Sequence, residues 1–392
     1  MTSLYRSVIL LLSVATIQVQ AIKWDVDGIK GGYQQQQPEL QQTTLHADST
    51  SAGPKLLRPT CMTQEESTPY LLIQENDEHF QFFKKEDIYF ESEYRSVRKL
   101  GQGSFGTVHL AIKKSNELKV VYKTIGKENV KLYTLESSPP PVCHSTEFST
   151  LYGKHVSARC MPSRPQNLLL PFEVKVQEYL SQSGYENPHV PSVIDYIVTE
   201  KAYILVMEYS GEEWVDLDRY IKKYGKFSVD KARLIIKEVV TALVSFKKFG
   251  ILHRDVAGRN ILYNDRTGGV KLIDFGVSEP LEGCNQDSSA QAKYSSTASR
   301  SLGRNPNAGR IEIRDIQNVG YLLYILLTWG DPDKDIDIPQ KEFAKELRNS
   351  LNNPESQLAI NAANLVASLF GYDLPSITTI EAILGHPFFT SQ

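Results

Sequence analysis

The stretch ILHRDVAGRNILY, residues 251–263, is the most specific element of the 392-residue sequence. It places the carboxylate of Asp255 five residues before the amide of Asn260. A carboxylate can take a proton from a hydroxyl, and an amide oxygen is a ligand that Mg²⁺ accepts. The segment LIDFG follows and adds a second carboxylate, Asp274. These residues predict a general base, Asp255, near two oxygen ligands for a metal ion.

A glycine-rich stretch, GQGSFGTV at residues 101–108, lies earlier in the chain. Its glycines, Gly101, Gly103 and Gly106, would let the backbone turn tightly and approach phosphate oxygens. A dinucleotide-binding fingerprint would require a helix directly after them. Here TVHLAI alternates like a β-strand, so the pattern predicts a phosphate-covering hairpin between two strands.

Lys123 lies on the third predicted strand, KVVYKTI, after the glycine-rich hairpin. An ammonium group at this place can bind the α- and β-phosphates of a nucleotide. A lone lysine on a strand is normally a solvated side chain, so the interpretation depends on its spacing from the other motifs. Because all four motifs occur in order, we interpret them together as one nucleotide site.

On these motifs the chain resembles the eukaryotic protein kinase family from about Tyr94 to Phe389. The resemblance implies a two-lobed α+β fold, in agreement with the order of strands and then helices along the chain. A small antiparallel sheet with one helix is expected at about residues 94–209, with an irregular insertion at 126–168, and a larger helical lobe at about 210–389. ATP, Mg²⁺ and a protein substrate are implied, with transfer of the γ-phosphoryl group to a hydroxyl.

The resemblance also assigns roles to individual residues. Asp255 would orient the acceptor hydroxyl and take its proton, while Lys123 would bind phosphates. Asn260 and Asp274 would hold Mg²⁺. Met207 would be the gatekeeper of the adenine pocket. The other residues expected around adenine and the phosphates are Gly101, Gly103, Gly106, Val108, Glu208, Tyr209, Ser210 and Leu262.

Two glutamates on the predicted helix PFEVKVQEYLSQSG compete for an ion pair with Lys123. The family pattern of glutamate, apolar residue, any residue and apolar residue fits Glu173, whereas the spacing back from NPHVP favours Glu178. We favour Glu173, because insertions collect more easily in the following loop than inside a helix. The other glutamate is expected to be solvated.

The chain departs from the family pattern at the adenine pocket and at the substrate platform. Val121 stands where the family usually has alanine, which crowds the adenine pocket. No Ala-Pro-Glu occurs between Gly276 and Asp315, and Ile377 stands at the position of the arginine that would pair with that glutamate. Because both the glutamate and the arginine of the family's ion pair are missing, no unpaired charge is left buried. We therefore interpret the region as a rebuilt substrate platform.

The acceptor and the control of the enzyme stay open at the sequence level. Ala257 replaces the lysine usual in serine/threonine kinases, and with Arg259 it resembles the tyrosine-kinase form of the loop. We favour serine or threonine over tyrosine as acceptor. Arg254 could dock a phosphorylated activation loop, or the segment NQDSSAQAKYSSTASRS could be a plain serine-rich loop. A pseudokinase scaffold and a small-molecule kinase are the alternative functions, but the complete set of four motifs favours an active enzyme.

The N-terminal residues predict export. Residues 1–21 combine Arg6, the apolar run Val8–Ile17 and a small residue, Ala21, as in a cleavable signal peptide. Residues 22–68 are rich in Gln, Ser and Thr and predict a disordered spacer. We therefore expect a secreted or secretory-lumen protein without a stable membrane span, with a signal-anchored or cytoplasmic protein as the alternative.

Cysteine content and charge add two further expectations. Four cysteines permit two disulfides with three possible connectivities, and none has the Cys-x-x-Cys spacing of a zinc site. The net charge of −3 argues against nucleic acid as a partner. The cysteines are Cys61, Cys143, Cys160 and Cys284.

Overall fold

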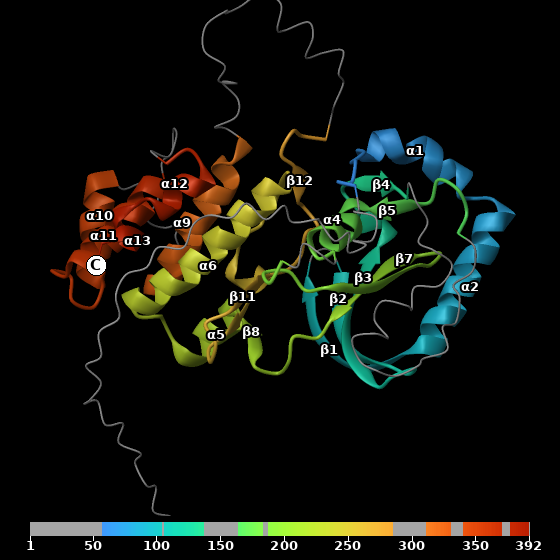
Figure 1. Ribbon diagram of the computed structural model, residues 1–392, viewed down its shortest axis with the longest axis horizontal. Helices are drawn as coiled ribbons and strands as arrows, with labels where there is room; N and C mark the ends of the chain where they lie inside the picture. Colours follow the sequence, from blue (N-terminus) through green and yellow to red (C-terminus); the bar gives the residue numbers. More distant parts are fainter. Residues whose placement is uncertain are drawn as a thin grey trace, which may run out of the picture. The chain divides into compact units, whose positions relative to one another are not determined.

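The computed structural model of the protein is shown in Figure 1. The predicted signal peptide lies outside the described residues, as do residues 22–56 of the predicted spacer and the two cysteines Cys143 and Cys160. Within the described part of the chain, no helix is long and apolar enough to cross a bilayer. The structure describes residues 57–103, 106–136, 164–182, 187–284, 311–330, 340–370 and 377–391.

A five-stranded antiparallel sheet forms the first lobe, with the strand order β1-β2-β3-β7-β6. Valine, isoleucine and tyrosine are frequent in β3, β6 and β7, and these side chains favour extended backbone. The sheet predicted from the sequence is confirmed. The strands are β1 (Tyr94–Gly103), β2 (Gly106–Lys113), β3 (Leu118–Gly126), β6 (Val193–Val198) and β7 (Ala202–Glu208).

One face of this sheet carries Lys123 and packs against a helix. Because side chains alternate along a strand, Val121 and Lys123 lie on the same face, and Met207 lies opposite Val121 in β7. Helix α4 (Phe172–Leu180) covers this face, since its Val174 belongs to the same buried apolar cluster as Met207. The expected single helix of the small lobe is therefore α4.

The opposite face is covered by a helix that precedes the sheet in the chain. Helix α2 (Asp77–Glu93) contacts β1 and β6 and runs beside the strands in Figure 1. The Phe90 ring stacks on Tyr94 and meets Tyr122 edge-on, with ring centroids 5.4 and 5.1 Å apart. These contacts fasten α2 to the sheet through apolar burial, and the sequence did not predict this helix.

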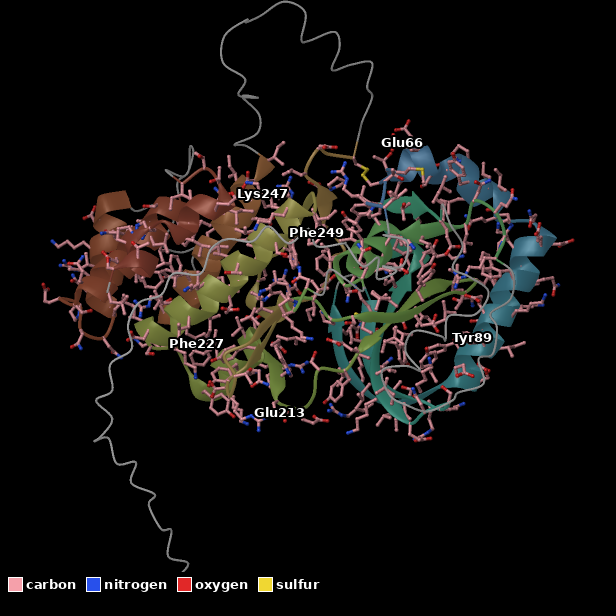
Figure 2. The ribbon with its side chains drawn as sticks, in the orientation of Figure 1. Glu66, Tyr89, Glu213, Phe227, Lys247 and Phe249 are labelled. Atoms are coloured by element: carbon pink, nitrogen blue, oxygen red, sulfur yellow. A yellow bond between two sulfur atoms is a disulfide. The ribbon has the colours of Figure 1, made fainter. Side chains whose placement is uncertain are left out.

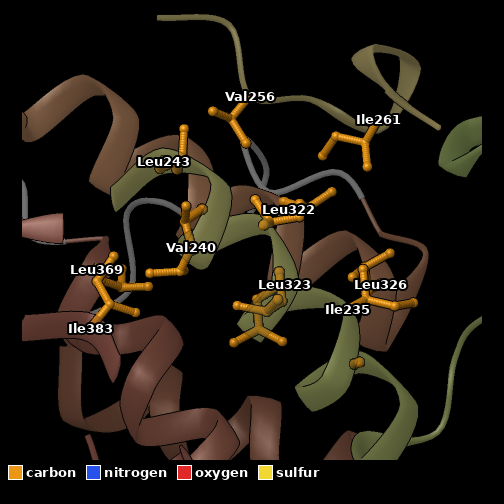
Figure 3. Close-up of a cluster of buried hydrophobic side chains, with 14 of the residues drawn as sticks. Ile235, Val240, Leu243, Val256, Ile261, Leu322, Leu323, Leu326, Leu369 and Ile383 are labelled. Carbon is orange, nitrogen blue, oxygen red and sulfur yellow. The ribbon is translucent and has the colours of Figure 1, made fainter. Parts of the chain in front are cut away.

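The second lobe is helical, as predicted. Its two longest described helices, α6 (Val229–Lys248) and α9 (Ile313–Thr328), pack against each other. Figure 3 shows their leucine, isoleucine and valine side chains meeting Leu369 and Ile383 from later helices. The remaining helices are α5 (Leu217–Tyr224), α10 (Gln340–Ser350), α11 (Gln357–Leu369), α12 (Ile380–Leu384) and α13 (Pro387–Thr390).

Short strands hold the loops that face the first lobe. β9 (Ile251–Leu252) pairs with β12 (Glu279–Pro280). β10 (Ile261–Asn264) lies between β8 (Trp214–Asp216) and β11 (Val270–Leu272). The loop between β9 and β10, which carries Asp255, is thus anchored at both of its ends.

The predicted insertion at residues 126–168 is ordered at its two ends. The 3₁₀ turn η1 (Lys127–Asn129) and β4 (Tyr133–Leu135) lie at its start, and β4 pairs with β5 (Leu169–Pro171) just after its end. The prediction of an irregular insertion is therefore wrong for residues 127–129 and 133–135, while residues 137–163 lie outside the described residues.

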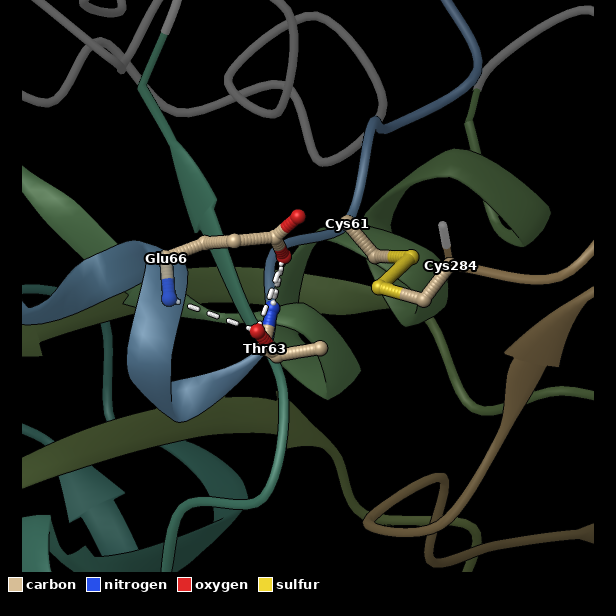
Figure 4. The surroundings of a disulfide bond; sticks show 4 residues. All are labelled: Cys61, Thr63, Glu66 and Cys284. Carbon is tan, nitrogen blue, oxygen red and sulfur yellow. Dashed lines mark hydrogen bonds between the residues drawn. A yellow bond between two sulfur atoms is a disulfide. The ribbon is translucent and has the colours of Figure 1, made fainter. Parts of the chain in front are cut away.

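The spacer prediction is wrong for residues 57–68, which fold onto the first lobe. Met62 exchanges two backbone hydrogen bonds with Tyr133 of β4, at 2.7 and 2.8 Å. Cys61 forms a disulfide with Cys284, which lies beyond β12 and 223 positions further along the chain (Figure 4). A disulfide that closes so long a loop stabilises a fold by about 2–5 kcal/mol.

A reciprocal cap starts the helix that follows this segment. Helix α1 (Gln64–Ile73) begins after Thr63, whose hydroxyl accepts a hydrogen bond from the Glu66 amide at 3.3 Å. The Glu66 carboxylate in turn accepts from the Thr63 N–H at 2.7 Å, as Figure 4 shows. The cap satisfies donors that a helix start otherwise leaves unpaired. It explains why a polar stretch becomes helical.

A buried charged network ties α2 to β6. Glu86 is fully buried and accepts hydrogen bonds from the Val198 N–H at 3.2 Å and from Arg164 at 3.5 Å. Tyr89, labelled in Figure 2, donates to Asp195 at 2.8 Å. Burial raises the pKa of Glu86 to about 7. The charged groups that face Glu86 are Arg164, Asp195 and Glu136.

We expect the protein to lose stability between about pH 4.5 and about pH 7 because of Glu86. In the unfolded chain the carboxyl group of Glu86 loses its proton near its ordinary pKa of 4.5, whereas in the folded chain it keeps the proton up to about pH 7. The unfolded state therefore binds fewer protons in this range, and the free energy of unfolding falls as the pH rises. The shift corresponds to at most about 3 kcal/mol. In urea unfolding across this pH range, the free energy of unfolding should fall less steeply with pH for Glu86→Gln than for the wild type. Equal slopes would contradict the role of Glu86.

Candidate active site

The loop between β9 and β10 brings Asp255 and Asn260 together. The amide nitrogen of Asn260 donates to the Asp255 carboxylate at 2.7 Å and to its backbone carbonyl at 3.0 Å, and the 3₁₀ turn η2 (Gly258–Asn260) makes this possible. Arg259 donates to both carboxylate oxygens, at 2.7 and 2.8 Å. The Asp255 side chain is 22% exposed, so it is held by two neighbours and still open to a substrate.

A buried carboxylate fixes the backbone of this loop. Asp315, fully buried on α9, accepts hydrogen bonds from the N–H groups of His253 at 3.1 Å and Arg254 at 2.7 Å. Asn318 donates to the Arg254 carbonyl at 3.3 Å. Arg254 has φ +70°, a conformation that non-glycine residues adopt only when their surroundings impose it. Burial raises the pKa of Asp315 to about 6.

Lys123 makes one ion pair with each of the two lobes. Its Nζ lies 2.6 Å from Glu173 on α4 and 2.8 Å from Asp274 in the second lobe. The side chains of Lys123 and Glu173 are 8% and 7% exposed. Burial by itself would lower the pKa of Lys123, but the two carboxylates outweigh it and raise the pKa. The lysine is therefore held as a cation in the cleft.

The competing glutamate on α4 lies elsewhere. Glu178 pairs with Lys175, three residues before it on the same helix. The structure therefore brings Glu173, and not Glu178, to Lys123. Glu178 is also more exposed, at 23% of its side chain, as expected for the residue outside the site.

The glycine-rich residues form the hairpin that the sequence predicts. Gly103 lies opposite Gly106 at the end of β1 and β2, and residues 104–105 lie outside the described residues. A Cβ at Gly106 would lie 1.9 Å from the Thr124 carbonyl oxygen, so no other residue fits without a backbone shift. A Cβ at Gly103 would meet nothing within 4 Å, so the space beside this glycine is open.

Arg219 of α5 holds the hairpin from the second lobe, and sequence reasoning missed it. Its guanidinium donates to the Leu100 carbonyl at 2.7 Å and pairs with Asp216 at 3.1 Å. A Cβ at Gly101 would lie 3.7 Å from the same guanidinium. Arg219 thus positions the start of the glycine-rich turn, although its own exposure makes each single contact weak.

The apolar residues expected around adenine lie on the face of the sheet that carries Lys123. Val108 is opposite Lys123 and Val121 is opposite Met207, and opposite residues share a face. Gln177 of α4 donates to the Met207 sulfur at 2.9 Å, so the gatekeeper position is fixed from behind by a buried amide. Val121, which is expected to crowd the adenine pocket, thus lies beside Met207.

The segment after β7 connects this face to the second lobe. Glu208 forms an ion pair with Lys271 of β11, and β11 pairs with β10, which carries Leu262. The hydroxyl of Ser210 is buried and has no hydrogen-bond partner among the described residues. A buried hydroxyl without a partner is costly, and a polar ligand atom would satisfy it.

The donor set fits Mg²⁺ and a nucleotide phosphate. Both side-chain hydrogen bonds of Asn260 use its nitrogen, so its amide oxygen is the atom that remains for a metal. The contacts of Asp274 with Lys123 and Gly276 use one carboxylate oxygen and leave the other. Two oxygen donors completed by substrate phosphates are a common Mg²⁺ site. No cluster of three or more His, Cys, Asp or Glu suited to a metal occurs in the described residues.

Arg254 is engaged by a carboxylate of the protein itself. Its Nε and Nη2 both lie 2.9 Å from Glu279 on β12, and the guanidinium also donates to the Ile311 carbonyl. The sequence leaves open whether Arg254 docks a phosphorylated loop or whether that segment is a plain serine-rich loop, and the segment lies outside the described residues. Within the described part of the chain, Glu279 takes the place of that anion.

A buried ion pair that the sequence did not reveal lies at the start of α9. Glu312 accepts from the Ile380 N–H at 2.9 Å and pairs with Lys247 of α6 at 2.8 Å. Lys247, labelled in Figure 2, also pairs with Glu381 at 2.7 Å. Ile377, which stands at the expected arginine position, packs against the apolar core. The Glu312 pair joins three helices without the family's glutamate–arginine pair.

We expect Lys247→Met to destabilise the protein by about 3 kcal/mol, because Glu312 is 6% exposed and would lose its cation. The double variant Lys247→Met/Glu312→Gln should regain most of this loss, since glutamine is neutral and can still accept from Ile380. Denaturant midpoints of the three proteins measure the effect. A double variant no more stable than Lys247→Met would contradict the pairing.

The sequence of the chain is similar to those of known proteins. Residues 152–389 match the family model of the protein kinase domain. The chain is 27% identical to Sucrose non-fermenting protein kinase 1 of Fusarium virguliforme over 76% of its length and 36% of that protein. It is 26% identical to Serine/threonine-protein kinase PSK1 of Saccharomyces cerevisiae over 74% of its length and 19% of that protein. It is also 26% identical to Serine/threonine-protein kinase pim-2 of Danio rerio over 76% of its length and 86% of that protein.

The chain thus spans a minor part of two of these relatives and most of the third. The family-model match covers more than half of the chain. It includes Glu173, the Asp255 loop and Asp274. Lys123 precedes the matched residues, and the structure pairs it with Glu173 and Asp274. The chain therefore belongs to the eukaryotic protein kinase superfamily.

Proposed function

We propose that the protein transfers the γ-phosphoryl group of ATP to a protein hydroxyl. The observation that supports this most is the convergence of Lys123, Glu173 and Asp274 in one ion-pair group, in which Lys123 and Glu173 are buried. Asp255 and Asn260 are hydrogen-bonded to each other in the anchored loop of the same lobe as Asp274. Phosphoryl transfer depends mainly on positioning and charge neutralisation, and these side chains provide both.

Each side chain would have one task. Lys123, held by Glu173, would bind phosphate oxygens of ATP. Asp255 would accept a hydrogen bond from the acceptor hydroxyl, orient it and take its proton as the new oxygen–phosphorus bond forms and the bond to ADP breaks. Asn260 and Asp274 would hold Mg²⁺, which supplies neutralisation of the phosphate charge when bound.

We infer serine or threonine as the acceptor. The relatives PSK1 and pim-2 carry serine/threonine-protein kinase in their names, which supports this choice. Arg259, whose side chain is 60% exposed beside Asp255, is the feature that favours tyrosine instead. The choice of serine or threonine over tyrosine is therefore a separate part of the proposal with its own test.

The function is tested by incubating the full chain with γ-labelled ATP, Mg²⁺ and a mixture of protein substrates. Label should enter protein, and acid hydrolysis should release phosphoserine or phosphothreonine. Phosphotyrosine alone would overturn the acceptor proposal. Label in small molecules but not in protein would overturn the choice of protein as substrate.

We also propose that the protein works in an oxidising compartment such as the secretory lumen. The disulfide between Cys61 and Cys284 supports this, since such bonds are rare in the cytosol. N-terminal sequencing of the expressed full chain should start at Ile22. An intact Met1 on an intracellular product would contradict the proposal.

A further inference from the structure

We propose that the disulfide between Cys61 and Cys284 is a redox modification site that controls phosphoryl transfer. In its closed form it holds the Glu173 end of α4 and the segment after Asp274 in the arrangement described above. A dithiol reductant would open it and lower the activity. This inference rests on the proposed function, because it names the regulation of the same site.

Cys61 is connected to Glu173 through a short series of backbone contacts. The next residue, Met62, pairs with Tyr133 in both directions, at 2.7 and 2.8 Å. Leu132, just before Tyr133, accepts a hydrogen bond from the Phe172 N–H at 2.9 Å. Phe172 is the first residue of α4 and directly precedes Glu173.

A side chain beyond Cys61 reinforces this connection. The amide of Gln64, at the start of α1, donates to the Val130 carbonyl at 2.9 Å. The chain on both sides of Leu132 is therefore held by the segment that follows Cys61. The position of Cys61 thus bears on where α4 begins and where Glu173 lies.

Cys284 is connected in the same way to the Asp255 loop. It lies four residues after Pro280 of β12, and β12 pairs with β9 just before the loop. Leu281 donates from its N–H to the Gly250 carbonyl at 2.8 Å. Glu279 on β12 also holds the Arg254 guanidinium at 2.9 Å. The disulfide therefore connects the segment that positions Glu173, the partner of Lys123, to the segment that holds the Asp255 loop.

Among the described residues, the disulfide is one of several contacts between these two segments, since Cys61 and Leu281 also pack against the same apolar core. Arg58 pairs with Glu282 at 2.8 Å, but the side chains are 36% and 55% exposed. Exposed ion pairs contribute little and are screened by salt. The two cysteines are only partly buried, so a small dithiol can reach the sulfurs. The disulfide is thus the strong and chemically reversible member of this link.

The chemical step is ordinary thiol–disulfide exchange. A thiolate of the dithiol attacks one sulfur, the bond between Cys61 and Cys284 breaks, and a mixed disulfide forms. The second thiol of the reductant then attacks the mixed disulfide and displaces the protein sulfur. This leaves two protein thiols and an oxidised, cyclic reductant. Two electrons and two protons pass from the dithiol to the protein.

The test compares the oxidised full chain before and after dithiothreitol with the variant Cys61→Ser/Cys284→Ser. Reduction and double substitution should each lower kcat/KM for ATP by about 5- to 150-fold, the usual range of coupling between two sites. Reoxidation should restore the wild type, and the variant should not respond to dithiothreitol. The matched control Cys143→Ser/Cys160→Ser should respond as the wild type does.

Unchanged kcat/KM after reduction, with the open bond verified by mass, would overturn the proposal. Hydrogen exchange of the Met62 and Tyr133 amides gives a second readout that needs neither activity nor a folded cysteine variant. Both amides should exchange at least about tenfold faster after reduction of the wild type, since local opening frees them. Unchanged exchange would also overturn the proposal. An oxidised wild type as inactive as Asp255→Asn would instead overturn the proposed function.

Discussion

Asp255→Asn is expected to lower kcat by about 10²- to 10⁴-fold, the usual contribution of a positioned base. Asparagine has the shape of aspartate but cannot take the proton of the acceptor hydroxyl. Its oxygen can still accept from Asn260, so the loop should keep its geometry. The lost ion pair with Arg259 is exposed at 60% on the arginine side and contributes little to stability. We therefore expect the unfolding midpoint and the ATP affinity to stay close to the wild-type values.

A matched control separates this effect from a general loss of charge. Asp230 at the start of α6 has a side chain that is 74% exposed and lies outside the site, so Asp230→Asn should keep wild-type kcat. Steady-state kinetics on the three proteins, with denaturation curves beside them, measures both properties. Wild-type kcat in Asp255→Asn would remove Asp255 from the mechanism. A loss of kcat matched by a loss of folded protein would do so as well.

Lys123→Met should damage both stability and activity, for two separable reasons. It leaves the buried carboxylate of Glu173 without its cation, which costs about 3–5 kcal/mol. It also removes the ammonium that would bind the phosphates, so ATP binding and kcat should both fall. The loss of stability and the loss of activity thus come from the same substitution but from different interactions.

A second substitution distinguishes them. In Lys123→Met/Glu173→Leu the buried charge of Glu173 is gone and only the more exposed carboxylate of Asp274 lacks its cation, so most of the stability should return while the activity stays lost. Urea midpoints and kcat/KM for ATP on the single and double variants give the comparison. A double variant that recovers activity would contradict the role of Lys123 in phosphate binding. One that recovers no stability would contradict the pairing with Glu173.

The fold and the core of the site could be predicted because their signals are local in the sequence. The glycine spacing, the alternating strands and the Asp255 loop each occupy a few consecutive residues, and backbone geometry at that scale follows from residue type. The choice of Glu173 over Glu178 also came from a local pattern on one helix. The structure places Glu173 at Lys123, although the roles of these residues in catalysis remain predictions.

The features that the sequence did not reveal depend on distant partners. The pair between Glu312 and Lys247 joins two helices, and no spacing in the sequence connects those residues. The disulfide of Cys61 spans 223 positions, and four cysteines alone cannot specify a pairing. Tertiary packing decides such contacts.

The helices before the sheet were missed for a related reason. Helix α1 contains Pro69 and has no apolar stripe, so its periodicity gives no signal. Its one local sign is the capping pattern of Thr63 and Glu66, three residues apart. That pattern sits in a polar tract that composition alone classifies as a spacer.

We expect this chain to be an active protein kinase whose base is Asp255. The most direct measurement incubates the oxidised full chain with Mg²⁺ and either γ-labelled or α-labelled ATP, beside Asp255→Asn. We expect label to enter protein from γ-labelled ATP only, in a reaction that requires Mg²⁺ and that Asp255→Asn nearly abolishes. Transfer from α-labelled ATP, or equal labelling by the wild type and Asp255→Asn, would contradict this expectation.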